Sequence, residues 1–254
     1  MPPTSRPRTG RASYRLALIG AACVLLLGAS AAPVTATPRT FVIDLGVRSD
    51  FVAQTNFVQC VGASMQMMLN MMEPGADHSA ATQQRLQALA REWSGPRPDG
   101  FERQGASVLG WATGLNLLGA GPYELAGTDT IEAALLAAAR AIRLTGKPVG
   151  LLMWHGRHAW VMSGFRATTD PLSPDARVTA VFVEDPLYPY GSSAWGPSPA
   201  PGAALTPAEL GRQFVPRRSS NRWPATTWGT QLAGKYVLVL PTKTDPHAYQ
   251  RRAV

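Results

Sequence analysis

The chain has 254 residues, 45% of them hydrophobic and 16% charged, and a formal net charge of +8. This length suits one sizeable domain or two small ones, and the composition excludes an intrinsically disordered chain. We find no internal repeat, which excludes a solenoid, and no Lys/Arg run with interleaved aromatic residues, so nucleic-acid binding is not indicated.

Residues 1–36 have the pattern of a secretory signal peptide. Four arginines at positions 6, 8, 11 and 15 come first, an apolar run follows from Leu16 to Gly28, and small residues offer cleavage sites at Ala29-Ser30-Ala31 or Val34-Thr35-Ala36. This order predicts removal of residues 1–36 and a secreted or extracytoplasmic protein without stable membrane insertion. The mature chain, residues 37–254, would be a single domain with a net charge of +4. Without cleavage, the apolar segment would anchor the protein at a cell surface.

Cys60 is the one cysteine left after cleavage, because the other, Cys23, lies in the apolar run. A single thiol excludes an internal disulfide, a redox pair and a four-cysteine metal site. In an oxidising compartment such a thiol is either buried and inert or kept reactive for a purpose.

The first half of the mature chain is predicted to be mainly helical. Apolar residues at helical spacing predict an amphipathic helix over Cys60–Met72, and Ser79 can cap a second helix with Leu86, Leu89 and Trp93 on its buried face. The remaining elements expected here are a strand over Thr40–Leu45, a loop over Gly95–Gly100, an apolar helix over Gly105–Leu118, and a helix to Leu144 opened by a capping box at Asp129–Glu132.

The second half is predicted to be an antiparallel sheet. Segments rich in Val and aromatic residues predict strands over Pro148–Met153, His158–Phe165, Val178–Glu184 and Lys235–Pro241. Leu187–Ala204 reads as a long loop, and Thr206–Glu209 has an N-cap, a Pro at the first helical position and a capping Glu. The expected class is therefore α+β, with the start of the Cys60 helix packed against the strand that begins at His158.

Four residues have the side chains that a thiol-based nucleophilic reaction needs. A thiol attacks carbonyl groups as its thiolate, which a helix amino terminus and a neighbouring imidazolium both favour, and these would come from the Cys60 helix and from His158. Asp185, at the end of a neighbouring strand, can orient the imidazole. The Cys60 backbone N–H and the Gln54 side-chain amide can stabilise an oxyanion. This chemistry requires no metal and no cofactor.

The same residues resemble a known family. Gln54 lies six residues before Cys60, as in papain-like cysteine peptidases, and Cys60–Leu69 resembles the nucleophile helix of their bacteriocin-processing (double-glycine-peptidase-like) branch and of the type III effector cysteine peptidases. Gly146–Gly150 and His158–Phe165 resemble the histidine block of that group, and Val181–Pro186 resembles its strand-Asp-Pro block. The matches run in the family order over roughly residues 40–190.

This resemblance implies a papain-like fold and a peptide or protein substrate. Cys60 would be the nucleophile, His158 the general base and acid, Asp185 the orienting residue and Gln54 the oxyanion donor. The chain departs from many relatives in having Val61-Gly62 after the cysteine and an extra polar loop over Ala167–Arg177.

Each assignment has an alternative. Cys60 could be a small core residue, and His155 competes with His158, although two histidines alone make a poor metal site. The residue that orients the imidazole could instead be Asn221, Asp170 or Asp175, and the side-chain oxyanion donor could be Gln59 or Asn56. An amidase or acyl transferase would use the same groups. A binding module on the same scaffold, or a structural domain with an inert thiol, would use none of them.

Overall fold

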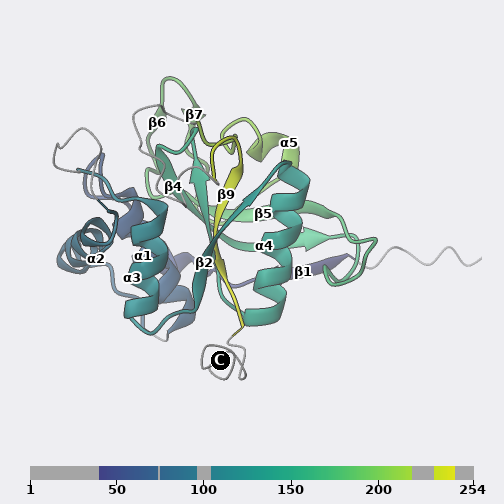
Figure 1. Cartoon of the computed structure of the whole chain (residues 1–254), viewed down its shortest axis with the longest axis horizontal. Coiled ribbons are helices and arrows are strands. Elements are labelled where there is room, and N and C mark those ends of the chain that lie inside the picture. The colour runs from purple at the N-terminus through teal and green to yellow at the C-terminus, as the bar shows by residue number, and fades with distance from the viewer. Residues whose placement is uncertain (1–39, 74, 96–103, 219–231, 244–254) are drawn as a thin grey trace, which may run out of the picture. The chain divides into compact units, whose positions relative to one another are not determined.

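An antiparallel sheet of seven strands forms the centre of the computed structural model, which describes residues 40–73, 75–95, 104–218 and 232–243 (Figure 1). The strand order is β2-β9-β3-β4-β5-β8, with β1 added beside β4. The strands are β1 (Phe41–Asp44), β2 (Tyr123–Thr128), β3 (Val149–Met153), β4 (His158–Ala167), β5 (Val178–Glu184), β8 (Ala203–Leu205) and β9 (Tyr236–Pro241). The same described residues form five α-helices, which confirms the α+β class.

Strand β4 holds the sheet together. Its first half pairs with β3, its second half pairs with β1 along the same edge, and β5 pairs along the other edge. Because β4 and β5 are antiparallel, with Val161 opposite Glu184, the end of β5 lies beside the beginning of β4. This register brings Asp185, which follows β5, to the end of the sheet where His158 begins β4.

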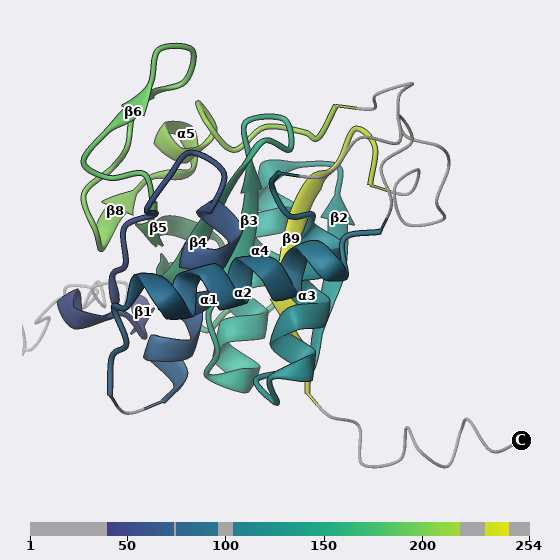
Figure 2. The same cartoon turned by 90° about the vertical axis from the view of Figure 1, so that its left-hand side faces the viewer.

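Helices cover both faces of the sheet, as Figure 1 shows. Helix α4 (Ile131–Thr145) packs on one face with the short helix α5 (Pro207–Leu210), against side chains such as Trp160 and Met162. Helices α1 (Cys60–Met72), α2 (Ala80–Glu92) and α3 (Val108–Leu117) cover the other face and lie in front of the sheet in Figure 2. Successive residues of a strand point to opposite faces, so β4 contributes Ala159 and Val161 to this second core.

Helix α1 lies between β4 and α2, and α3 packs directly on β2 and β9. Every residue from Val61 to Met68 is buried, so the expected amphipathic pattern is wrong for its first two turns. Met65, Met67 and Met68 are fully buried and fill the core. Its buried polar residues bond to neighbouring backbone: Gln66 and Asn70, for example, both donate to the Asp77 carbonyl. The helix that carries Cys60 is therefore held on all sides.

Several local predictions are wrong. Strand β2 was not predicted, because Tyr-Glu-Leu-Ala-Gly-Thr alternates poorly, and it forms through pairing with β9. The expected loop after Leu187 contains the β6 (Gly191–Ser192) and β7 (Gly196–Pro197) hairpin and the start of β8. Trp93 is 46% exposed rather than buried. Thr130, and not Asp129, caps α4 by accepting from the Ala133 N–H, and the Asp129 carboxylate is bound to Lys235.

Some predictions fall outside the described residues. The signal peptide lies in residues 1–39, most of the Gly95–Gly100 loop lies in residues 96–103, and Asn221 lies in residues 219–231. Among the residues that are described, no helix is both long enough and apolar enough to cross a membrane.

Candidate active site

Cys60 is the first residue of α1 and is partly exposed. The N-cap residue, Gln59, makes no side-chain capping bond. Gln87 of α2 caps the helix instead of Gln59. The Gln87 Oε1 accepts from the Gly62 N–H at 2.8 Å, and the Gln87 Nε2 donates to the Val58 carbonyl at 2.9 Å. The Cys60 N–H, at the positive end of the helix dipole, has no acceptor among the described residues and is free to bind an anionic oxygen.

A second glutamine of α2 fixes the loop that precedes Cys60. Gln83 accepts from the Thr55 N–H at 2.8 Å and donates to the Ala53 carbonyl at 3.0 Å. Gln83 and Gln87 are both buried and lie four residues apart on one face of α2. The sequence analysis missed them, although two glutamines at this spacing in a helix with an apolar stripe are a signal of a buried polar face.

His158 joins the other two members of the predicted constellation. It is 4% exposed, and its Nε2 lies 2.7 Å from Oδ1 of Asp185. Since Nε2 faces the carboxylate, Nδ1 is the nitrogen left for the thiol, and Cys60 is close enough to contribute to the raised pKa of His158. Asp185 is fully buried, and its Oδ1 accepts in addition from the Leu187 N–H at 2.9 Å.

The electrostatics of this group favour a charged imidazole. Burial lowers the pKa of His158, but the hydrogen bond to Asp185, the interaction with Cys60 and the negative charge of both partners outweigh it and raise the pKa to about 9. A buried carboxylate is costly unless it is paired, and Oδ2 of Asp185 has no partner among the described residues. The imidazolium of His158 is the positive charge that compensates Asp185.

The helix of Cys60 and the strand of His158 are also linked directly. Ser64, one turn after Cys60, is fully buried and donates its hydroxyl to the carbonyl of Ala159 at 3.3 Å. This bond lies next to Cys60 and His158 and fixes α1 relative to β4. It was not predicted, because a serine inside an apolar helix carries no signal of its partner.

An aromatic stack covers His158. The Trp154 ring centroid lies 4.1 Å from that of the imidazole at 22°, and the Trp195 ring lies parallel to the Trp154 ring at 6.5 Å. Trp154 has a positive φ of 56° and its indole donates to Gln213, so the turn before β4 holds it in place. Trp195 lies in the loop expected after Leu187 and fixes this loop against the stack.

Gln54 lies near this group but is bonded elsewhere. Its backbone N–H donates to the Pro186 carbonyl at 2.7 Å, which ties it to the residue after Asp185. Its side-chain Nε2 donates to the Asn56 carbonyl at 2.8 Å, and Oε1 is buried without a partner among the described residues. An amide carries two N–H groups, so one donor of Gln54 is not used.

The alternative residues lie in other surroundings. His155 binds the Pro216 carbonyl through Nδ1 and packs its edge against Trp195. Asp170 forms an ion pair with Arg143 at 3.1 Å, and Asp175 is exposed. Within the described parts of the chain, no three His, Cys, Asp or Glu side chains are grouped to hold a metal ion.

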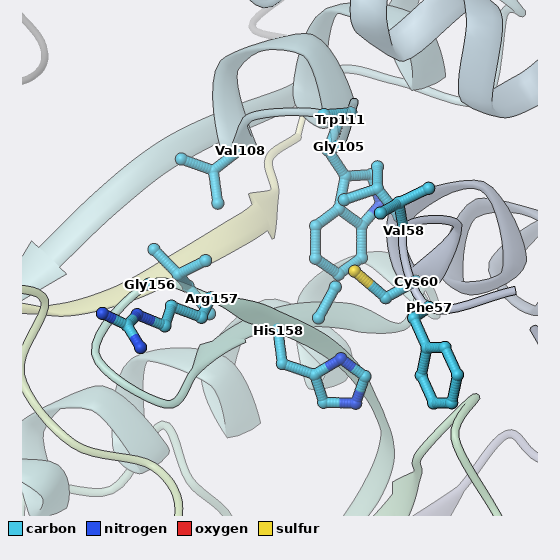
Figure 3. A pocket seen from close by; sticks show the side chains of 13 residues that line it. Phe57, Val58, Cys60, Gly105, Val108, Trp111, Gly156, Arg157 and His158 are labelled. Carbon is cyan, nitrogen blue, oxygen red and sulfur yellow. The ribbon is translucent and has the colours of Figure 1, made fainter. Parts of the chain in front are cut away.

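A pocket opens beside Cys60 and His158, between the start of α1, the α3 region and the β3–β4 turn (Figure 3). Its volume is about 130 Å³, and its walls combine polar and apolar surface. In comparisons with known proteins, no family model and no curated protein matches this chain.

Proposed function

We propose that the protein is an exported, papain-like cysteine peptidase. The observation that supports this most is the position of His158, which bonds Asp185 through Nε2 and leaves Nδ1 for Cys60 at the start of a helix. A nucleophile, a base in reach and a third group that orients the base are the arrangement of covalent acyl transfer. Export is expected from the sequence of residues 1–36.

The proposed reaction has two steps. The Cys60 thiolate attacks the carbonyl carbon of the substrate, and as the C–N bond breaks, the His158 imidazolium gives its proton to the leaving amine. A thioester and a neutral imidazole remain. His158 then takes a proton from water, the resulting hydroxide attacks the thioester, and the acid product leaves as the thiolate and the imidazolium are restored.

The negative oxygen of each tetrahedral intermediate needs donors. The Cys60 N–H is one, since it has no acceptor among the described residues. We propose the unused side-chain N–H of Gln54 as the second donor. The backbone N–H of Gln54 donates to the Pro186 carbonyl, and this bond holds the residue beside the site. Removal of one such donor lowers kcat by about 100-fold or more in other enzymes.

Alkylation of Cys60 tests the proposal without a known substrate. We expect iodoacetamide to react rapidly with Cys60 well below pH 8.5, about the pKa of a free thiol, because His158 stays charged up to about pH 9. His158→Gln should remove this reactivity at low pH. Slow alkylation that follows an ordinary thiol profile would contradict the enzymatic function.

Turnover is the second test. The wild type should cleave members of a peptide library, while Cys60→Ala should show no turnover and unfold at an unchanged temperature. Rapid alkylation without peptide cleavage, together with cleavage of simple amides or transfer of acyl groups, would exclude a peptidase and retain the thioester chemistry.

A further inference from the structure

Apolar side chains and polar groups both line the pocket beside Cys60. In Figure 3 the Trp111 ring lies next to the Cys60 sulfur, with Val108 and Val58 on opposite sides of it, and Leu152 and Ala159 are among the other lining residues. Pockets that hold whole small-molecule ligands measure roughly 300–1,000 Å³. With about 130 Å³, this pocket has room for one side chain and not for a longer stretch of substrate.

The lining of this pocket contains one permanently charged group, the guanidinium of Arg157. Arg157 is exposed and has no ion pair or hydrogen bond from its side chain to the described residues. In Figure 3 its guanidinium points away from the Cys60 sulfur. Among the described residues, no acidic side chain lines the pocket, so the charge of Arg157 is not neutralised there, whereas the imidazolium of His158 is paired with Asp185.

The backbone around Arg157 is well fixed. The N–H groups of Gly156 and Arg157 both donate to the Met153 carbonyl, at 2.9 and 3.0 Å, and Gly156 takes the positive φ of 99° that closes the turn. Arg217 packs against the same turn, since a Cβ on Gly156 would lie 3.3 Å from its Cγ. The positive charge of Arg157 is thus presented from a rigid turn directly before His158.

We propose that this pocket is the specificity subsite of the peptidase and that Arg157 selects a substrate side chain that is apolar near its backbone and ends in a carboxylate, as glutamate does. The methylene groups would contact the apolar side chains of the lining, and the carboxylate would pair with the guanidinium. This inference rests on the proposed function, because it needs the acyl group of the substrate to lie at Cys60.

Two alkylating reagents of similar size test the charge of the subsite without a peptide. Iodoacetate is an anion and iodoacetamide is neutral, so the ratio of their rates with Cys60 reports the local positive potential. We expect Arg157→Gln to lower the iodoacetate/iodoacetamide ratio by roughly threefold at low salt. Arg166→Gln is the matched control, since Arg166 is exposed on the same strand pair but lies over Phe182, and it should leave the ratio unchanged.

Peptide pairs that differ only by Glu or Gln test the specificity itself. With amidated peptides, the wild type should show a kcat/KM about tenfold or more higher for the Glu member at one position, as expected for a charge-assisted pair of about 1.5 kcal/mol or more. Arg157→Gln should abolish this preference, and Arg157→Glu should reverse it. Thermal unfolding of both variants should match the wild type, because Arg157 is exposed.

The outcomes separate this inference from the proposed function. Peptide cleavage with equal rates for Glu and Gln, unaffected by Arg157→Gln, would overturn the subsite and leave the peptidase standing. A preference for a free carboxyl terminus over an amidated one, with no effect of Glu, would overturn the side-chain assignment. If no peptide is cleaved but Arg157→Gln still lowers the iodoacetate/iodoacetamide ratio, the peptidase proposal would be overturned and an anion-selecting pocket supported.

Discussion

The His158–Asp185 pair sets the charge state of the site. Two opposing effects act on the imidazole, since burial disfavours its charged form and the two partners favour it. The buried carboxylate of Asp185 has no other cation in contact among the described residues, so each group makes the charge of the other tolerable. Removing the charge from one partner should therefore have a clear effect on the other.

We predict that Asp185→Asn lowers the pKa of His158 from about 9 to about 6.5 or below, because the effect of burial then dominates. An asparagine can keep the hydrogen bond to Nε2 without the negative charge. NMR titration of the His158 ring resonances measures this directly. Asp170→Asn is the control, since Asp170 pairs with Arg143 on the surface and should leave the titration unchanged. An unchanged pKa in Asp185→Asn would show that Asp185 does not stabilise the imidazolium.

At the scale of elements, side chains of α2 position the start of α1. Gln87 satisfies one of the N–H groups at the start of α1 and the carbonyl of Val58 just before it. The two helices also approach closely at Gly62, where a Cβ would lie 2.7 Å from the Gln83 carbonyl oxygen. The position of Cys60 thus depends on side chains and backbone of α2.

We predict that Gln87→Leu lowers the free energy of unfolding by about 1–3 kcal/mol, because the Gly62 N–H and the Val58 carbonyl lose their partner in a buried place. Denaturant unfolding measures this, and alkylation of Cys60 by iodoacetamide should become slower in the same variant. Gln84→Leu places the same change on the exposed side of α2 and should alter neither quantity. Equal effects of the two substitutions would contradict the capping role of Gln87.

Local sequence signals predicted the elements that they determine. The bounds Cys60–Met72 and Val178–Glu184 agree with α1 and β5, since helical spacing and a run of β-branched residues are properties of the segments themselves. Strand β2 could not be predicted in this way, because its partner β9 is over one hundred residues away in the chain. The same holds for the site: the order of Cys, His and Asp was visible, whereas Gln87, Ser64 and Trp154 act through contacts that only the fold creates.

At the scale of the whole molecule, a second buried carboxyl lies next to the site. Glu184 is 3% exposed, and a Cβ on Gly46 would lie 3.4 Å from its Oε1. Burial raises its pKa to about 8; a backbone hydrogen bond at Gly202 opposes this, and the carboxylates of Asp44 and Asp50 add to it. Glu184 is thus mainly protonated at neutral pH, which leaves Asp185 as the charged neighbour.

The pKa of Glu184 and that of His158 make the stability depend on pH in the same direction. Folding raises the pKa of Glu184 from its ordinary value of 4.5 to about 8, and that of His158 from 6.5 to about 9. Between these values, each group keeps its proton in the folded state and loses it in the unfolded state. In these ranges the folded state binds more protons than the unfolded state, so the free energy of unfolding falls as pH rises. The fall begins near pH 4.5 through Glu184, and His158 extends it to about pH 9.

We predict that Glu184→Gln flattens this dependence between about pH 5 and pH 8 and raises the free energy of unfolding at pH 8, by an amount on the order of 3 kcal/mol. The amide keeps the shape of the side chain and has no charge to bury. Denaturant unfolding at intervals of pH measures the curve, and the part that remains between pH 6.5 and 9 should vanish when His158→Gln is added. Asp129→Asn, which changes an exposed carboxylate, should leave the slope unchanged. A slope as steep in Glu184→Gln as in the wild type would mean that Glu184 is ionised in the folded protein at neutral pH, and that the pH dependence arises from His158.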